Sequence, residues 1–598
     1  MSSSSFSPSL INNNFKTQLN TFRDNQLKWN GWGYIHSYFE IDKENGNFYM
    51  KSKKYTDLNE KSLPGLRPWV EKNLGIDINY KTPSISIQSL KLPTPLLNQN
   101  LLEFLQLEDI YYSYSPLNRL TRSHGQTLEE IINIRIGKIK RIPDLVVWPR
   151  TEKQILKIIE GAKKFKTLLI PIGGGTCVSQ ALKCPNNVQK LICSVDMEMM
   201  NSIINLDVKN MTATGILGQD LEKQLNEKGF TCGHEPDSLE FSTLGGWIST
   251  RASGMKKNKY GNIEDLLLSV RICTSKGILQ PRRLGQVPRL SSGPDLLQLI
   301  LGSEGQMEQR CFGAIIFPDF ESGVNFFRNV ALKRCQPASL RLVDNAQFQM
   351  GQAMRIKEGS YITSDIWQTF ARIYLTRWKG FKPDQMVATT CVFEGSKEEV
   401  EIERQRLFTL ASNFGGIRAP DENGQFGYRL TFAIAYLRDL ALDFGVIGES
   451  FETSVPWSKV INLCKNVKTL IIHEASKYGI KQHILATCRV TQVYDSGACV
   501  YFYFAFNYRG MDIEKALEIY ENIEASARNE ILACGGSISH HHGIGKIRKR
   551  WLPTTIGNLE ISLIKSLFEQ IDPEELFKNE NLFDESIQQN KEKEKSKL

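Results

Sequence analysis

The stretch RIPDLVVWPRTEKQILKIIEGAKKFKTLLIPIGGGTCVS, Arg141–Ser179, decides the fold class of this 598-residue chain. A short apolar run at Val146 and Val147 is followed by a predicted capping box, in which Thr151 begins a helix and Gln154 completes the box. Isoleucines then recur on one helical face, and Leu168–Pro171 forms a second short strand. The pattern predicts strand, helix, strand and glycine loop, which together are an α/β unit.

The glycine loop is PIGGGTCVS, Pro171–Ser179. Three successive glycines after a strand let the backbone approach a ligand closely, and Thr176 and Ser179 add hydroxyl groups. This indicates a cradle for a phosphate or pyrophosphate, with a simple tight turn as the alternative. The loop is not G-x-G-x-x-G and no P-loop lysine follows it, so a nicotinamide or ATP site is disfavoured.

A second segment, GHEPDSLEFSTLGGWISTRASGMKKNKYGNIEDLLLSV, spans residues 233–270 and is rich in glycine, serine, threonine and alanine. So many small polar residues are poor material for a core. They are typical of a wall that lies flat against a large planar ligand. A third stretch, Gly302–Gly305, repeats the pattern as G-S-E-G.

These three motifs together resemble the FAD-binding domain of the vanillyl-alcohol oxidase / p-cresol methylhydroxylase superfamily. Further stretches, KWNGWGY, GESFETSVPW and SHHHGIGK, are similar to a member of that superfamily that forms ether lipids. One departure follows G-S-E-G, where QMEQRC replaces the family's next flavin contact and its strand. The resemblance implies non-covalent FAD, held by Pro171, Ile172, Gly173, Gly174, Gly175, Thr176, Cys177, Asp237, Ser238, Leu239, Glu240, Phe241, Ser242, Thr243, Thr250, Arg251, Ala252, Ser253, Gly302, Ser303, Glu304 and Gly305.

The expected fold class is α+β with α/β subdomains, in which a cap domain for substrate accompanies the FAD-binding domain. The length predicts more than one domain. We expect a disordered tail over 1–27, a helical and loop region over 28–137, and the FAD-binding domain over 138–320. The cap domain follows over 321–560, and a C-terminal helix with a charged, signal-bearing tail over 561–598.

The stretch CVYFYFAFNY, Cys499–Tyr508, alternates with the period of a strand. Its phenylalanines are predicted to face a core, whereas Tyr501 and Tyr503 face either a pocket or the rim of a half-buried sheet. The resemblance makes Tyr501 the catalytic acid/base. We expect positive charge nearby to favour its phenolate.

Two arginines are candidate substrate ligands. Arg438 interrupts an otherwise apolar helix, AIAYLRDLAL, and suits either a phosphate or a structural ion pair. Asp439 and Asp443 lack the spacing to face it on a helix. The resemblance assigns the substrate phosphate to Arg438 and a role in activity to Arg341.

Three of the eight histidines are consecutive, His540, His541 and His542. Neighbours in an extended segment point to opposite sides, so His541 is not expected to share a metal with the other two, and we predict no metal site. A structural loop is one alternative. We favour imidazoles of near-neutral pKa that assist proton transfer, and the resemblance likewise places this run in the active site.

Bulk composition excludes several classes of protein. The chain is 41% hydrophobic and 23% charged with a net charge of +9, which favours anionic ligands or a membrane surface. No nucleic-acid motif is present. Twelve scattered cysteines without a C-x-x-C pair fit a reducing compartment. No apolar run reaches the ~18 residues of a membrane span, and the N-terminus has no secretory signal pattern.

The final residues, Ser596–Lys597–Leu598, match the peroxisomal import tripeptide. We therefore expect a peroxisomal enzyme, peripheral on the lumenal side of the membrane. The resemblance implies exchange of the acyl group of acyl-dihydroxyacetone phosphate for a fatty alcohol, through a covalent flavin adduct without net redox. Expected partners are those two substrates, the membrane surface, the import receptor and a second copy in a homodimer, but no nucleic acid. The alternatives are a FAD-linked hydroxy-acid oxidase or dehydrogenase, and a non-catalytic scaffold.

Overall fold

The structure is a computed structural model. It describes residue 19 and residues 21–42, 44–56, 58–207, 212–214, 218–280, 309–355 and 373–582. Gly302–Gly305 and Ser596–Leu598, which carry two of the predictions above, lie outside the described residues. The described chain mixes helices with parallel and antiparallel sheets, so the predicted α+β class is confirmed.

The Arg141–Ser179 stretch folds as predicted. Strand β5 (Leu145–Trp148) and strand β6 (Leu168–Ile172) lie on either side of β7 (Ile192–Asp196) and run parallel to it, and helix α6 (Glu152–Lys164) connects β5 to β6. Strand β4 (Tyr111–Ser113) adds an antiparallel edge. The Thr151 hydroxyl caps α6, but the Gln154 side chain accepts from the backbone of Arg150, so only half of the predicted capping box forms.

Shorter elements surround this sheet. Helices α3 (Gln99–Leu107), α4 (Pro116–Thr121) and α5 (Leu128–Arg135) precede β5. After β7 come the pair β8 (Asn205–Asp207) and β9 (Thr212–Thr214), then helix α7 (Gly218–Asn226). The 233–270 segment carries α8 (Leu244–Thr250), α9 (Lys257–Tyr260) and α10 (Ile263–Leu266), and the pair β10 (Ile272–Thr274) and β11 (Gly277–Leu279) follows.

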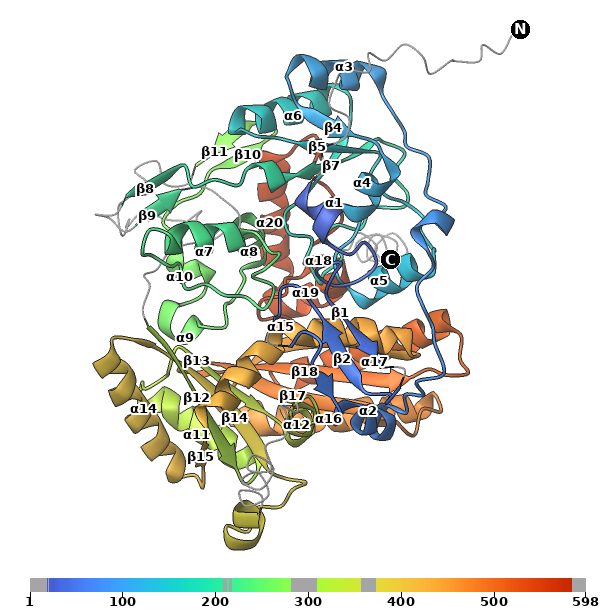
Figure 1. Ribbon diagram of the computed structural model, residues 1–598. Helices are drawn as coiled ribbons and strands as arrows, with labels where there is room; N and C mark the ends of the chain where they lie inside the picture. The colour runs from blue at the N-terminus through green and yellow to red at the C-terminus, as the bar shows by residue number, and fades with distance from the viewer. Residues whose placement is uncertain are drawn as a thin grey trace, which may run out of the picture.

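A seven-stranded antiparallel sheet forms the second half of the molecule, in the order β15-β12-β14-β13-β17-β18-β16. Figure 1 shows it below the β5–β7 sheet. The strand bounds are Gln309–Phe317 for β12, Ser339–Val343 for β13, Val387–Gly395 for β14, Ile417–Ala419 for β15, Val446–Pro456 for β16, Ile484–Val493 for β17 and Gly497–Asn507 for β18.

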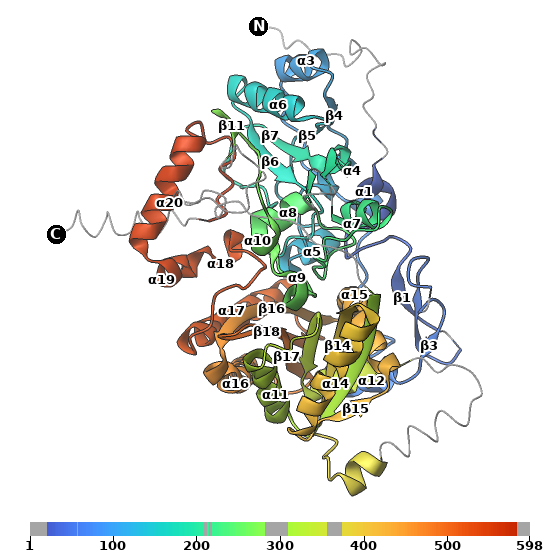
Figure 2. The same cartoon turned by 90° about the vertical axis from the view of Figure 1, so that its left-hand side faces the viewer.

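Helices cover both faces of this large sheet. One face packs on α11 (Phe320–Leu332), α14 (Lys397–Ser412), α16 (Val460–Lys477) and α17 (Ile513–Ala533). Figure 2 shows α11, α14 and α16 below and in front of the strands. The other face packs on α2 (Leu66–Leu74), α12 (Asn345–Ala353) and α15 (Asp421–Asp443). Phe502, Phe504 and Phe506 are fully buried on the first face, as the alternation predicted.

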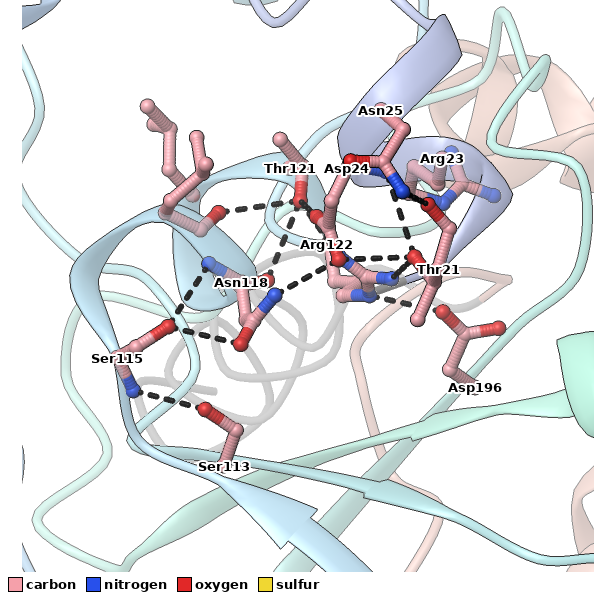
Figure 3. Close-up of polar contacts among 12 residues, drawn as sticks. Thr21, Arg23, Asp24, Asn25, Ser113, Ser115, Asn118, Thr121, Arg122 and Asp196 are labelled. Atoms are coloured by element: carbon pink, nitrogen blue, oxygen red, sulfur yellow. Dashed lines mark hydrogen bonds and ion pairs between the residues drawn. The ribbon is translucent and has the colours of Figure 1, made fainter. Parts of the chain in front are cut away.

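The region before residue 28 is ordered earlier than expected. Helix α1 (Phe22–Gln26) forms inside the predicted disordered tail. Its Asp24 carboxylate pairs at 2.5 Å with Arg122, whose side chain is completely buried and also binds Asp196 at 2.8 Å (Figure 3). The guanidinium group of the neighbouring Arg23 donates to the carbonyl of Gly173 at 2.5 Å. The Arg122 ion pairs hold the N-terminal segment in place and the Arg23 hydrogen bond joins it to the glycine loop, which composition alone does not indicate.

The remaining elements lie at the two ends of the chain. A small sheet of β1 (Tyr38–Ile41), β2 (Phe48–Lys51) and β3 (Ser62–Leu63) precedes α2. Helices α18 (Gly545–Arg548), α19 (Leu552–Ile556) and α20 (Asn558–Ile571) follow the histidine run. The chain then returns to the first sheet, where the Leu169 amide donates to Leu576 at 2.7 Å. Among the described residues, no helix combines the length and apolar character that crossing a bilayer requires.

Candidate active site

The glycine loop is shaped by its contact with the second motif. A Cβ atom added to Gly174 would collide with the backbone of Phe241, and one at Gly173 would collide with the Thr243 side chain. Thr243 in turn caps α8. The sequence interpretation explained these glycines by the close approach of a ligand, and at Gly173 and Gly174 the structure adds a second reason; the predicted cofactor contact stays a prediction. Hydrogen is required there because two loops of the protein touch.

A cavity of about 460 Å³ lies between the two loops and the large sheet. Of the predicted cofactor contacts, those that line it are Pro171, Gly173, Gly174, Gly175, Thr176, Cys177, Asp237, Ser238, Ser242, Thr243, Thr250 and Ala252. Arg438, Tyr501, His541 and His542 line the same cavity. The tertiary fold therefore brings together motifs that are several hundred residues apart in the sequence.

The other predicted contacts point elsewhere. Ile172 is buried within β6, and the Glu240 carboxylate accepts from the Tyr55 hydroxyl. Phe241 packs its ring edge-on against Trp32. Leu239 packs in a small apolar cluster with α7 and α8, and Ser253 binds Gln492 at 2.9 Å. Arg251 ends α8 in a left-handed conformation. These residues shape the loops and do not line the cavity.

The cavity wall fits a dinucleotide with a flat ring. The glycine loop and the hydroxyl-bearing residues Thr176, Ser238 and Thr250 line one cavity, and backbone amides and hydroxyls are the donors that a pyrophosphate takes. A Cβ at Gly246 would meet only the Thr243 hydroxyl, at 3.1 Å, so packing within the protein does not account for the glycine. A small residue at this position leaves the cavity wall flat. The residues present therefore fit FAD.

Tyr501 and the histidines form one hydrogen-bonded cluster. Tyr501 lies on β18, and its hydroxyl is 2.5 Å from Nε2 of His541 and 3.4 Å from Nε2 of His542. His540 does not line the cavity, but its Nδ1 is 2.7 Å from Nδ1 of His541. The strand therefore presents its phenol to two imidazoles, as a site for moving protons would require.

Glu452, which sequence reasoning missed, holds the histidine run in place. Its buried carboxylate accepts from the backbone amides of His540, His541 and His542, the last at 2.9 Å. Burial opposes ionisation, yet the pKa of Glu452 lies well below its usual value, because the carboxylate is favoured by His542, His541 and His540 whenever they become protonated and by the Arg548 charge. A fixed negative charge therefore lies beneath the histidines. Its position in GESFETSVPW offers no local signal, because only the register of β16 with β18 brings it there.

Two sequence interpretations about acidity were wrong. Burial lowers the pKa of His540 to about 3 and the pKa of His541 and His542 to about 4, so these imidazoles are not near neutral pKa. Burial, followed by the Asp237 charge, raises the pKa of Tyr501 well above its usual value. Desolvation outweighs the positive charges that were expected to favour a phenolate. The resting site holds a neutral phenol beside neutral imidazoles.

The geometric reason given against a metal was also wrong. His540 and His541 do converge, and their donor atoms lie within 4.8 Å of each other and of the Cys499 thiol, a residue the sequence analysis did not consider. However, the two Nδ1 atoms are hydrogen-bonded to each other at 2.7 Å. A cation would have to break that bond and ionise Cys499, whose thiol pKa burial raises well above its usual value.

Arg438 already has two carboxylate partners, and one of them is its sequence neighbour Asp439, at 3.7 Å, contrary to the expectation from helical spacing. One terminal nitrogen of the Arg438 guanidinium pairs with Glu449 at 2.8 Å and also donates to the backbone carbonyl of Gln126. Asp443 pairs with Arg135 instead, and Asp439 also pairs with Lys28, at 3.1 Å. The Nε of Arg438 is buried without a partner. The ion-pair alternative thus holds as far as the contact goes, while the guanidinium still borders the cavity.

Asp237 connects two arginines. Its carboxylate pairs with Arg341 at 2.9 Å and with Arg489 at 3.2 Å, and these charges outweigh burial and lower its pKa to about 2. The Arg489 guanidinium lies 4.9 Å from the centre of the Tyr501 ring. Arg341 lines a smaller neighbouring cavity and not the main one. Asp237 therefore organises cations around Tyr501 and also borders the cavity.

The far end of the main cavity is apolar. It is lined by side chains of α2 and α15, among them Leu66, Trp69, Val70, Leu437, Leu440 and Ala441. A single cavity thus joins a polar cluster to a hydrophobic channel, which suits a substrate with a charged head and a hydrocarbon chain.

Comparisons with known proteins agree with this geometry. Two family models match, one for a FAD binding domain over residues 143–280 and one for FAD linked oxidases, C-terminal domain, over residues 306–581. An alkyldihydroxyacetonephosphate synthase of Caenorhabditis elegans is 53% identical, over 94% of this chain and 96% of that protein. A solved structure of an alkyldihydroxyacetonephosphate synthase is 27% identical with a TM-score of 0.78, over 93% of this chain and 97% of that one.

A more distant solved structure, p-cresol methylhydroxylase, shares the fold at 13% identity with a TM-score of 0.58, over 81% of this chain and 97% of that one. The predicted fold of the vanillyl-alcohol oxidase / p-cresol methylhydroxylase type is confirmed, and so is the prediction that FAD is the cofactor.

Proposed function

Because the chain belongs to the alkyldihydroxyacetonephosphate synthase family, we propose that it forms the ether bond of ether lipids. The enzyme releases the fatty acid from acyl-dihydroxyacetone phosphate and joins a long-chain fatty alcohol to the same carbon. It is a FAD-dependent transferase, and the exchange involves no net oxidation. The single observation that carries the chemistry is the Tyr501–His541 contact of 2.5 Å at the wall of the cavity that both FAD motifs line.

The leaving carboxylate departs from an sp³ carbon next to a ketone, so an α-proton must be removed and later returned. Tyr501 is the group placed to accept and return that proton, and His541 is within hydrogen-bond distance to assist it. FAD, when bound, supplies an electrophilic ring that can hold the carbon between the two half-reactions. The glycine loop and the 237–250 segment would hold the cofactor.

The head group and the chains occupy opposite ends of the cavity. Arg438 is proposed to bind the substrate phosphate, because its guanidinium borders the cavity and its Nε has no partner. Arg341 does not line this cavity, and it is proposed to act by pairing with Asp237, which does. The apolar end, between α2 and α15, takes the hydrocarbon chain of the acyl or alkyl substrate.

The cellular setting is also a proposal. Ser596–Leu598 would be read by the peroxisomal import receptor. Substrates with long chains partition into membranes, so we propose that the enzyme works peripherally at the lumenal membrane surface. We also propose that it is a homodimer.

The test is transfer of labelled fatty alcohol into product by the purified, FAD-loaded protein. We expect label to enter alkyl-dihydroxyacetone phosphate with equal release of fatty acid and no bleaching of the flavin. A hydroxy-acid oxidase would bleach its flavin with a hydroxy acid and transfer no label. A colourless protein that cannot be reconstituted with FAD would instead support the scaffold.

A further inference from the structure

A row of hydrogen bonds leads away from Tyr501 into the protein. It passes from the Tyr501 hydroxyl to His541 Nε2 at 2.5 Å, and from His541 Nδ1 to His540 Nδ1 at 2.7 Å. It continues from His540 Nε2 to the Tyr494 hydroxyl at 2.6 Å, and from there to Gln492 Oε1 at 3.1 Å. Tyr494 and Gln492 have no role in the function proposed above, and neither lines the main cavity.

The far end of this row has a fixed direction. The Gln492 amide nitrogen donates to the Gly254 carbonyl at 3.2 Å, so its oxygen faces Tyr494. Asn262 Oδ1 lies on the same side, 3.4 Å from the Tyr494 hydroxyl. If Tyr494 gave its only proton to His540, its lone pairs would face two amide oxygens. Tyr494 therefore donates toward the amides and accepts from Nε2–H of His540.

The remaining protons then follow one by one. His540 is neutral, because burial lowers its pKa to about 3, so its Nδ1 is bare. The Nδ1 atom of His541 must carry the shared proton, because two lone pairs facing each other at 2.7 Å repel. His541 is neutral too, with a pKa of about 4, so its Nε2 is bare. That atom can only accept the proton of Tyr501.

From this geometry we infer that Tyr494 and Gln492 are positioning residues that set the histidine tautomers, so that Tyr501 acts as a base only by passing its own proton to His541. The inference rests on the proposed function, in which Tyr501 removes the α-proton. It also explains how a tyrosine whose phenol is too weak an acid to ionise at rest can take part. No free phenolate is needed, because the phenol oxygen gains one proton as it gives up another.

The step balances in protons and charge. The carbon–hydrogen bond of the substrate breaks, its electron pair stays on the substrate, and its proton goes to the Tyr501 oxygen. The Tyr501 proton moves to His541 Nε2, and the His541 Nδ1 proton moves to His540 Nδ1. His540 then carries two N–H groups and one positive charge, which balances the new negative charge on the substrate. Reversal returns the proton.

Two charges fix where the moved proton stops. The buried Glu452 carboxylate lies beneath the histidine run and attracts the imidazolium. On the far side of His540, the Lys257 ammonium lies 3.4 Å from the centre of the Tyr494 ring and disfavours a positive charge there. It also opposes the charge on His540, but less than Glu452 favours it. An amide oxygen is also a poor proton acceptor, so the row ends at the histidine pair. Arg548 also acts on Glu452 and favours its ionised form.

The direct test reads the tautomers by ¹⁵N NMR of the FAD-loaded protein labelled only in histidine. Signals of His540 and His541 are assigned by their loss in His540→Gln and His541→Gln. We expect His541 protonated at Nδ1 and His540 at Nε2, and we expect both to become mixtures in Tyr494→Phe. The matched control is Tyr112→Phe, which removes a buried hydroxyl bonded to a glutamine side chain, Gln106, outside the site.

Kinetics give a second reading. Tyr494→Phe should lower kcat by roughly 10- to 10²-fold, less than the ~10²–10⁴-fold of losing the acid/base itself, and leave KM for both substrates unchanged. Tyr112→Phe should leave kcat unchanged. Protonation of His541 at Nε2 in the wild-type protein, or unchanged tautomers and kcat in Tyr494→Phe, would overturn the inference. Absence of alcohol transfer by the wild type would instead contradict the proposed function, whatever the tautomers.

Discussion

Arg438 of α15 and Glu449 of β16 form an ion pair of 2.8 Å at the edge of the cavity, although ten residues lie between them in the sequence. The helix ends at Asp443 and the next strand returns alongside it, which brings the carboxylate to the guanidinium. A substrate phosphate would approach an arginine that is already oriented. This contact makes the role of Arg438 testable.

Arg438→Lys keeps the charge and loses the planar fork. We expect KM for acyl-dihydroxyacetone phosphate to rise by about tenfold or more while FAD stays bound, because a point charge cannot satisfy Glu449, Gln126 and a phosphate together. Steady-state kinetics at a fixed alcohol concentration measure this. Arg135→Lys, which affects the Arg135–Asp443 pair away from the cavity, is the matched control. A lower melting temperature with normal KM would assign Arg438 to stability alone.

Tyr501→Phe removes one oxygen and hardly changes packing. Both half-reactions need the same proton, so release of fatty acid and incorporation of alcohol should fall together, by the ~10²–10⁴-fold typical of a lost acid/base. The protein should remain yellow and folded. Near-wild-type transfer of labelled alcohol by the purified variant would remove Tyr501 from the mechanism.

Gly174→Ala should destabilise the protein as well as weaken FAD binding. The added methyl group would collide with the Phe241 backbone, so the two loops would have to separate. Gly245→Ala is the control, because a Cβ there meets nothing within 4 Å. Thermal unfolding of both apo-proteins decides the point. Equal melting temperatures would mean that the loops tolerate the methyl group.

Acid should destabilise the protein before its carboxylates protonate. His124, His234, His540, His541 and His542 have pKa values lowered to about 3 or 4, mainly by burial. The unfolded chain binds protons on these groups below about pH 6.5, and the folded chain does not until about pH 4. The free energy of unfolding should therefore decrease as the pH is lowered from about 6.5 to about 4.

Urea unfolding at several pH values measures the slope of this decline. His234→Gln should reduce it by about one proton. Asp237 is a carboxylate and not an imidazole, but it also makes the protein less stable as the pH falls. Its pKa of about 2 gives stability that is present above about pH 4 and lost below it. A flat stability between pH 6.5 and pH 4 would show that the buried histidines are not neutral in the folded protein.

Import can be tested by deleting one residue. A fluorescent protein fused to the N-terminus leaves Leu598 as the last residue, and deleting Leu598 should change punctate fluorescence into a diffuse signal. Replacing Lys593, upstream of the tripeptide, serves as the control. Punctate fluorescence after the deletion would mean that another signal directs the protein.

The sequence determined local structure and the identity of the motifs. The spacing of apolar residues predicted β5, α6 and β6, and the strict alternation in β18 predicted which face Tyr501 shares with Tyr503. Periodicity suffices there because a helix or strand repeats its own orientation along the chain. The FAD motifs and the histidine run were visible for the same reason, since each is contiguous in the sequence.

The tertiary structure decided partners and acidity. Glu452, Glu449, Arg489 and Tyr494 reach the site only through strand register and helix packing, which no local pattern encodes. The histidines and Tyr501 were assigned the wrong pKa because the assignment considered neighbouring charges alone, and burial cannot be read from a sequence. In this site, desolvation outweighs those charges, and it follows from how the two halves of the molecule close around the cavity.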